Sequence, residues 1–251
     1  MVSPGQDRDS SSAVGIPAGR SRSISIFFPC HNEAAVIEEV VSRALSVLKD
    51  LASDYEVIVV NDGSRDATGS IADRLAAANP KVRVVHHPAN RGYGAALQSG
   101  IAACSKDLIF FTDGDGQFDL AELKYLLPLI DSHDIVIGYR LNRQEGIVRR
   151  FNGWAWTRLV CFLFSLRVRD IDCAFKLFHR RVFDDMTLRS GGALISTEIL
   201  ARTARKGCSI AQVGVHHFPR RSGQATGAKP AVILRAFREL FRLRRQILGG
   251  D

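Results

Sequence analysis

The chain has 251 residues, of which 46% are hydrophobic and 24% charged, so it can bury a sizeable core in one domain. Its net charge of +8 is uneven: residues 220–251 hold eight Lys/Arg and two acids, a net +6, which leaves the body nearly neutral. The five cysteines are scattered and lack a C-x-x-C spacing, which argues against a disulfide framework or zinc site and fits a reducing compartment.

The N-terminal segment 1–22 is rich in Ser and Gly and has no apolar stretch of the kind found in signal peptides. We expect a disordered tail there. The longest apolar run, LVCFLFSL at 159–166, is far shorter than the roughly 20 residues that span a bilayer. We therefore expect a protein that is soluble or peripheral to a membrane.

From residue 23 onward, strand-like apolar runs alternate with segments of helical periodicity. This alternation is typical of βαβ units, so we predict an α/β fold with a mainly parallel sheet and helices on both faces. Continuous Val/Ile runs fit strands that are buried on both faces. The predicted strands are 23–28, 55–60, 82–86, 107–112 and 134–139. The predicted helices are 32–51, 66–78, an Ala-rich segment ending near 104, and 119–130.

The second half of the chain changes character. No internal repeat or linker interrupts residues 24–247. Its pattern predicts helices over 145–166 and 194–206, a strand over 209–218 and a basic amphipathic helix over 230–247.

Polar or glycine-rich residues follow nearly every predicted strand of the first half. Open parallel sheets bind ligands beyond the carboxyl ends of their strands, which lie along one edge. We therefore expect these segments to form one site at that edge. They are PCHNE (29–33), NDGSRD (61–66), NRGYG (90–94), DGDGQ (113–117) and Arg140.

Within DGDGQ, Asp113 and Asp115 are the outer residues of a D-x-D motif. Alternate residues of an extended chain point the same way, so both carboxylates can face one point. Two like charges so close favour a cation between them, and Mg²⁺ or Mn²⁺ held by two carboxylates and substrate phosphates fits. The alternative is a solvated Asp/Gly turn that caps a helix beginning near Asp119.

Six motifs occur in the order seen in family 2 glycosyltransferases: FPCHNE, VVNDGSRD, NRGYGAALQSGI, FTDGDGQF, VIGYR and DCAFKLF. The set most resembles the branch typified by dolichol- or polyprenyl-phosphate mannose synthases, over residues 23–230. The resemblance implies a GT-A domain over this range, with a nucleotide-binding sheet, C-terminal helices of an acceptor region, inverting chemistry and Mg²⁺ or Mn²⁺. Residues 231–251 are expected to form a separate basic helix.

The resemblance also implies roles for individual residues, while Gly92 is expected to permit a tight turn near the donor. The ending RRSGQATGAKP departs from the R-x-x-G-x-S-K ending of the mannose synthases. This departure leaves the role of Lys229 and the identity of the sugar open. Catalysis is expected to involve Asp115, Arg140 and Arg220. The implied contacts are Pro29, Asn32 and Glu33 with the nucleotide, Asp62 with the base or ribose, Asp113, Asp115 and Gln117 with the metal, Arg140 with the acceptor phosphate, and Lys176 and Arg220 with phosphates of donor or acceptor.

The predicted reaction moves a hexose from GDP-mannose or UDP-glucose to a polyprenyl phosphate at the cytoplasmic face of the membrane. A phosphate oxygen is already ionised near neutral pH, so this acceptor needs no strong general base. A hydroxyl acceptor on a glycan would need one, and Glu198 is then the candidate catalytic base. An equally open interpretation makes Glu198 a first-turn acid of a helix that begins at Ser196 or Thr197.

The C-terminal helix is expected to carry an apolar side flanked by arginines, which suits an anionic membrane surface. The aromatic stretch 151–166 is a second membrane-facing candidate. We thus expect a protein peripheral to the inner face of the cell membrane, with no nucleic-acid partner. The alternatives are that these segments pack on the protein's own body, or join a homo-oligomer or a membrane-protein partner. The apolar side comprises Phe237, Leu240, Phe241, Leu243 and Ile247.

Two other classes of function fit part of the pattern. Phosphatases of the haloacid dehalogenase type also place D-x-D-G after an apolar strand, usually the first, with Thr or Val after the glycine. Here the motif follows the fourth strand and Gln117 takes that position. A catalytically silent membrane-associated adaptor could keep the sugar-nucleotide pocket, but the intact set of Asp113, Asp115 and Gln117 disfavours it.

Overall fold

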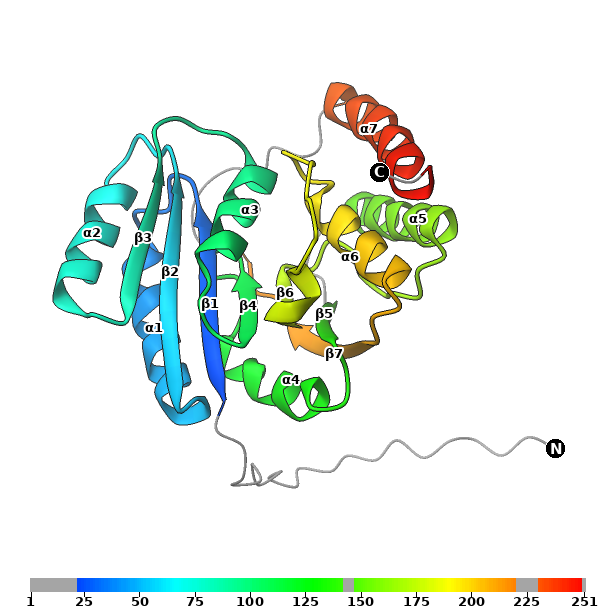
Figure 1. Ribbon diagram of the computed structural model, residues 1–251. Coiled ribbons are helices and arrows are strands. Elements are labelled where there is room, and N and C mark those ends of the chain that lie inside the picture. The colour runs from blue at the N-terminus through cyan, green and yellow to red at the C-terminus, as the bar shows by residue number, and fades with distance from the viewer. Residues whose placement is uncertain (1–21, 142–146, 220–229, 250–251) are drawn as a thin grey trace.

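A computed structural model of the chain describes residues 22–141, 147–219 and 230–249 (Figure 1). Its sheet has seven strands in the order β3-β2-β1-β4-β6-β5-β7. Six strands run in one direction, and β6 is antiparallel to both β4 and β5. The strands are β1 Ser23–Cys30, β2 Asp54–Asp62, β3 Val82–His87, β4 Leu108–Thr112, β5 Ile135–Leu141, β6 Phe175–His179 and β7 Ile210–His216.

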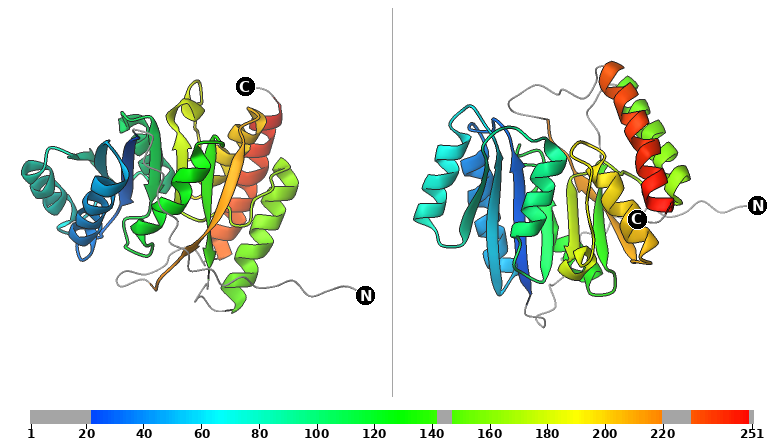
Figure 2. Two further views of the ribbon diagram at one scale, coloured as in Figure 1. Left: turned by 90° about the horizontal axis from the view of Figure 1, so that it is seen from below. Right: turned by 45° about the horizontal axis from the view of Figure 1, so that its top comes forward.

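Helices cover both faces of the sheet, as the sequence predicted. The helices α1 and α2 pack on one face and α3 on the other, where α3 also contacts α6 (Figures 1 and 2). Two short 3-10 turns lie at Leu120–Glu122 and Arg180–Phe183. The helices are α1 Ile37–Leu51, α2 Thr68–Ala78, α3 Tyr93–Ala103, α4 Leu123–Ile130, α5 Ile147–Phe164, α6 Ile195–Arg205 and α7 Pro230–Leu248.

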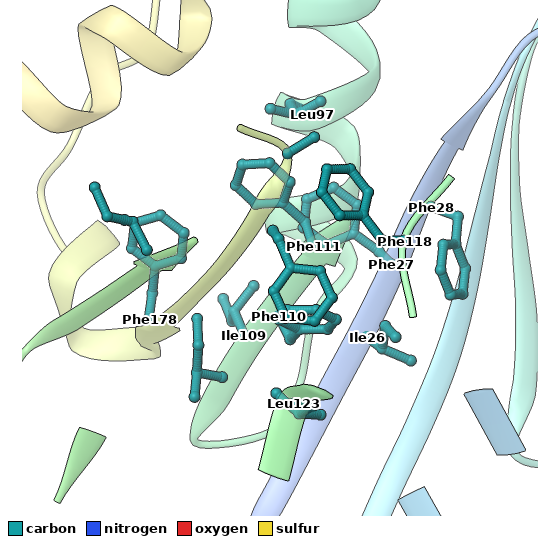
Figure 3. Packing of buried hydrophobic residues seen from close by; sticks show 14 of the residues in the cluster. Ile26, Phe27, Phe28, Leu97, Ile109, Phe110, Phe111, Phe118, Leu123 and Phe178 are labelled. Atoms are coloured by element: carbon teal, nitrogen blue, oxygen red, sulfur yellow. The ribbon is translucent and has the colours of Figure 1, made fainter. Parts of the chain in front are cut away.

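The core is built on the central strands, whose side chains are buried on both faces. All five residues of β4 are buried, and its Phe111 ring lies 5.5 Å from Phe27 and 5.9 Å from Phe178 (Figure 3). Such aromatic contacts add to the free energy gained from burial. The helix α3 approaches this layer closely at Gly100, where an added Cβ would lie 2.2 Å from the Phe27 ring. The loops at the ends of these strands therefore rest on a rigid base.

Most predicted elements are confirmed within a few residues. The helix expected from residue 32 begins at Ile37, because residues 31–36 form a turn bonded to the loop after β2. The expected helix over 119–130 opens with a 3-10 turn, where Asp119 Oδ1 accepts a hydrogen bond from the Ala121 amide at 3.0 Å. Strand β6 was not predicted, since its short segment had been assigned only as a motif.

The C-terminal helix α7 packs against the body through Leu240, Leu243 and Ile247. Among the described residues, no helix combines the length and apolar character needed to cross a bilayer. The expected tail over 1–22 falls almost wholly outside the described residues. The expected division into a domain over 23–230 and a separate helix stays a prediction.

Candidate functional site

The carboxyl ends of β1, β2, β4 and β5 lie along one edge of the sheet (Figure 1). Because β6 runs the other way, its amino end reaches the same edge, where Phe175 pairs with Thr112 at the end of β4. The segment 169–174 is thereby brought beside the D-x-D motif. The topology thus gathers every strand-end motif of the sequence at one edge.

The loops after β1 and β2 are bonded to each other. Asn32, at φ 60°, donates from its amide to Ser64 Oγ at 3.0 Å, and its Oδ1 accepts from the Arg65 amide at 2.8 Å. The Glu33 amide donates to Thr68 Oγ1 at 2.8 Å. These bonds hold the expected nucleotide-binding residues Asn32 and Glu33 in a single rigid turn.

Asp62 connects the loop after β2 to the loop after β3. Its buried carboxylate accepts hydrogen bonds from the amides of Arg91 at 2.8 Å and Gly92 at 2.9 Å, and contacts His87 Nδ1 at 2.6 Å. Gly92 adopts φ 91°, a conformation that favours glycine. This positive φ fits the turn expected at Gly92, and its place near the donor stays a prediction. Asp62 itself shapes the loop, and its contact with a base or ribose stays a prediction.

The D-x-D turn lies against the end of β1. Gly114 packs so closely that an added Cβ would lie 2.4 Å from Cys30 Sγ. Asp115 is only 4% exposed, and its Oδ1 accepts a hydrogen bond from the Gln117 amide at 3.1 Å. Burial raises the pKa of the Cys30 thiol, and the nearby carboxylates of Glu33, Asp113 and Asp115 raise it further. The thiol therefore stays neutral and acts as packing beneath the motif.

Gln117 ties the motif to the segment after β7. Its side-chain Nε2 donates to the Phe218 carbonyl at 2.8 Å, and the Phe218 amide donates to the Gln117 carbonyl at 2.8 Å. These two hydrogen bonds fix the chain at Phe218, two residues before Arg220. Arg220 and Lys229 themselves lie outside the described residues, so their expected phosphate contacts stay predictions.

The donor set of this turn fits a hard divalent cation. Within 22–141, 147–219 and 230–249, no group of three or more His, Cys, Asp or Glu side chains is arranged to hold a metal. Two carboxylates with one amide oxygen suffice when substrate phosphates complete the shell, as Mg²⁺ sites usually require. Asp113, Asp115 and Gln117 carry two carboxylates and one amide oxygen on one short turn, and their role as metal ligands stays a prediction. This arrangement matches a metal site whose coordination is complete only when the nucleotide phosphates are bound.

Arg140 emerges from β5 in a bidentate pair with Asp170. Its Nε and Nη2 lie 2.7 and 2.9 Å from the two carboxylate oxygens of Asp170, and both side chains are mostly buried. The neighbouring Arg169 stacks on the ring of Tyr139 at 3.9 Å. Asp170 thus fixes the plane of the guanidinium at the site edge. The sequence analysis missed Asp170, although the acidic pair in RDIDCAF was a visible signal.

Lys176, the expected phosphate contact, is a buried residue of β6. It points into the sheet from β6, is fully buried, and its ammonium donates to the carbonyls of Ile171 and Cys173. Burial lowers the pKa of this ammonium. In the described conformation Lys176 holds the segment before β6 in place. Its expected contact with a phosphate stays a prediction.

Glu198 is also fully buried. Its carboxylate accepts hydrogen bonds from the amides of Arg189 and Ser190 at 2.7 to 3.1 Å and from Arg202 Nε at 2.9 Å. This carboxylate lies in the first turn of α6. The geometry favours the interpretation of Glu198 as a first-turn acid, and its role as a base stays untested.

A further residue contacts the D-x-D motif, and the sequence analysis missed it. The Tyr93 hydroxyl, at the start of α3, donates a hydrogen bond to Asp113 Oδ1 at 3.0 Å. Burial raises the pKa of Tyr93 well above its usual value, and Asp113 adds to that shift. Tyr93 therefore stays protonated and orients the carboxylate. The segment NRGYG was expected at this edge of the sheet, but no role was assigned to Tyr93, because its contact with Asp113 arises only in the fold.

Replacing Tyr93 with Phe should remove this bond without leaving a cavity. We expect the Mn²⁺ concentration for half-saturation to rise about tenfold, the usual size for a hydrogen bond to a charged group. Electron paramagnetic resonance titration with Mn²⁺ and nucleoside diphosphate measures this directly. Tyr55→Phe is the control. Tyr55 lies near the amino end of β2, away from the site, so this variant should leave the Mn²⁺ affinity unchanged. Equal affinities for both variants would contradict the orienting role.

Comparison with known proteins gives a consistent result. The family description "Glycosyl transferase family 2" matches residues 25–189. The polyprenol monophosphomannose synthase of Mycolicibacterium smegmatis is 29% identical over 215 residues, which are 79% of this chain and 78% of that protein. The glycosyltransferase AglD of Haloferax volcanii is 31% identical over 211 residues, 78% of this chain and 33% of that protein. The undecaprenyl-phosphate 4-deoxy-4-formamido-L-arabinose transferase of Shewanella sediminis is 30% identical over 205 residues, 80% of this chain and 61% of that protein.

The chain thus spans a third to about three fifths of the length of the last two relatives. A solved structure with the same fold is the glucosyl-3-phosphoglycerate synthase of Mycobacterium tuberculosis in complex with Mn²⁺, UDP-glucose and phosphoglyceric acid. It has a TM-score of 0.67 and 22% identity, and the match covers 92% of this chain and 81% of that chain. This likeness confirms the expected GT-A fold.

Proposed function

Because the chain belongs to glycosyl transferase family 2, we propose that it moves a hexose from a nucleotide sugar to a polyprenyl phosphate. The observation that carries this proposal is the meeting of the D-x-D turn, the bonded loops after β1 and β2, and Arg140 at one edge of the sheet. Several relatives bear names of transferases that act on polyprenyl, dolichyl or undecaprenyl phosphate. GDP-mannose and UDP-glucose are the proposed donors.

In the proposed reaction, an ionised oxygen of the acceptor phosphate attacks the anomeric carbon of the sugar. The bond from that carbon to the diphosphate breaks, its electron pair goes to the departing nucleoside diphosphate, and the configuration inverts. Charge therefore gathers on the diphosphate. A divalent cation held by Asp113, Asp115 and Gln117 would neutralise this charge as a Lewis acid. The attacking oxygen carries no proton, so no general base is required.

The chain's own residues position the reactants. Tyr93 and the Gln117 amide hold the two carboxylates of the D-x-D turn. Asn32, Glu33 and the backbone at Pro29 form the wall proposed to meet the nucleotide. Arg140 is the proposed contact of the acceptor phosphate, since a guanidinium donates charge-assisted hydrogen bonds to phosphate oxygens. Asp170, which already binds its Nε and Nη2, orients the guanidinium in advance.

The test is turnover of nucleotide sugars by the purified chain. A panel of donors is incubated with Mg²⁺ or Mn²⁺, with and without a short-chain polyprenyl phosphate, and nucleoside diphosphate release is followed. We expect release that requires both the metal and the lipid phosphate. Transfer to a glycan hydroxyl with no response to the lipid would replace the proposed acceptor. Hydrolysis of a phosphomonoester without an acceptor would instead indicate a phosphatase.

A further inference from the structure

The helices α5 and α7 expose large aromatic side chains to solvent instead of burying them in the core. On α5 the exposed fractions are 62% for Phe151, 55% for Trp154 and 83% for Phe162. With Arg158, these residues recur at helical spacing and form one outward stripe, while Val160 faces the core. Exposed aromatic groups of this size mark interaction sites when they gather on one surface.

A second helix, α7, also exposes aromatic side chains. It lies beside α5, with Phe237 and Trp156 in an edge-to-face contact at 5.7 Å and Arg244 Nε donating to the Leu163 carbonyl at 3.2 Å (Figure 2). Phe237 and Phe241 are exposed on α7, whose other described apolar side chains, Leu240, Leu243 and Ile247, are buried against the body. Phe237 meets α5 at Trp156, on a different side of that helix from the stripe, so we name only the set Phe151, Trp154 and Phe162 the aromatic face.

Positive charge surrounds the aromatic face. The Arg158 guanidinium lies 5.8 Å from the centre of the Trp154 ring, the arrangement of a cation–π pair. Beside it, a groove of about 460 Å³ is lined by Trp154, Arg158, Arg167 and Arg169, among others. The described side chains of α7 add four exposed arginines against a single acid, Glu239. They are Arg238, Arg242, Arg244 and Arg245.

This combination selects an anionic bilayer surface over a protein partner. Aromatic rings settle at the level of lipid headgroups, and arginines beside them bind lipid phosphates. Each basic residue near an anionic leaflet strengthens binding further. Arg169, which also lines the groove, stacks on Tyr139, the neighbour of Arg140. The aromatic face is therefore connected to the proposed acceptor site.

We propose that the aromatic face docks the protein on an anionic lipid bilayer, with the rings of α5 in the headgroup layer. The choice of a bilayer as partner rests on the proposed lipid-linked acceptor, and the surface itself is assigned from exposure and charge. Docking through α5 would hold Arg140, which precedes this helix in the chain, close to the membrane surface. The acceptor phosphate would then meet the site without leaving the bilayer.

The experiment uses the full chain without donor or acceptor, so that binding is measured apart from catalysis. The protein is mixed with vesicles of phosphatidylcholine alone or with phosphatidylglycerol, and bound protein is measured by co-sedimentation. We expect binding to the anionic vesicles that weakens with salt. The double variant Trp154→Ala/Phe162→Ala should bind at least about tenfold more weakly, because both rings lose their burial in the interface.

The chain offers a matched control on α4. There Tyr125 is likewise exposed, and the Lys124 ammonium lies 5.0 Å from its ring, yet this pair lies away from α5 and α7 (Figure 1). Tyr125→Ala should bind vesicles as the parent does. If Tyr125→Ala and the double variant lose binding equally, or neither loses any, the aromatic face is not the docking surface. A concentration-dependent dimer that the double variant abolishes, without vesicle binding, would assign the face to a second copy instead.

Fluorescence separates insertion from mere attraction, because the chain contains only two tryptophans, Trp154 and Trp156. With Trp156→Phe, the remaining Trp154 emission should shift to the blue on vesicles and be quenched by brominated acyl chains. With Trp154→Phe, the half-buried Trp156 should change little. Absence of quenching for Trp154 would overturn insertion. Inactivity toward every sugar nucleotide alongside normal vesicle binding would reject the proposed function and leave the docking surface standing.

Discussion

Replacing Asp115 with Asn is expected to lower transferase turnover by at least about a thousandfold while the fold is retained. The substitution keeps the shape of the side chain and the acceptor oxygen for the Gln117 amide, but removes the negative charge. Asp115 is almost fully buried, so the solvent cannot compensate for the negative charge that a divalent cation loses in this variant. Asp113→Asn should act in the same direction, since Tyr93 holds its carboxylate at the same turn.

Asp119→Asn is the matched control, because Asp119 lies on the same segment but only caps the turn at Leu120–Glu122. An Asn caps almost as well as an Asp, so this variant should keep near-normal turnover. Nucleoside diphosphate release measures activity, and Mn²⁺ titration by electron paramagnetic resonance measures metal binding independently. Near-normal turnover in both Asp113→Asn and Asp115→Asn would falsify the metal assignment.

Much of the fold follows from local pattern. The strands β1, β2 and β4 are continuous apolar runs, and burial on both faces is what such runs predict. The D-x-D turn could be placed because its polar residues follow one of these runs, at the edge where parallel sheets bind ligands. Neither inference needed knowledge of distant contacts, and both are confirmed.

The remaining contacts depend on tertiary structure. Tyr93 meets Asp113 only because α3 packs on β1, the neighbour of β4 in the sheet, and Asp170 meets Arg140 only because β6 returns antiparallel between β4 and β5. The same reversal buries Lys176, which a motif comparison had assigned to phosphate. A positive charge in a motif cannot by itself distinguish a ligand contact from a buried hydrogen-bond donor.

Replacing Glu198 with Ala is expected to lower the free energy of unfolding by about 3–5 kcal/mol, the usual cost of removing one partner of a buried ion pair. The variant would leave Arg202 and the amides of Arg189 and Ser190 without their buried carboxylate. Chemical denaturation followed by circular dichroism measures the change. Glu39→Ala is the control: Glu39 and Arg43 are also four residues apart on a helix, but both are exposed, so the loss should be within about 0.5 kcal/mol.

The stability of Glu198 variants also decides between its two interpretations. Glu198 holds the loop 189–192, which in turn receives the Gly94 amide at the Gly191 carbonyl and Gln98 Nε2 at the Ser190 carbonyl. Loosening this loop should therefore disturb α3 and, through Tyr93, the D-x-D turn. Under the structural interpretation, turnover and stability fall together, and Mn²⁺ affinity falls with them. A Glu198→Gln variant with parental stability and Mn²⁺ affinity but lost turnover would instead identify a general base, and with it a hydroxyl acceptor.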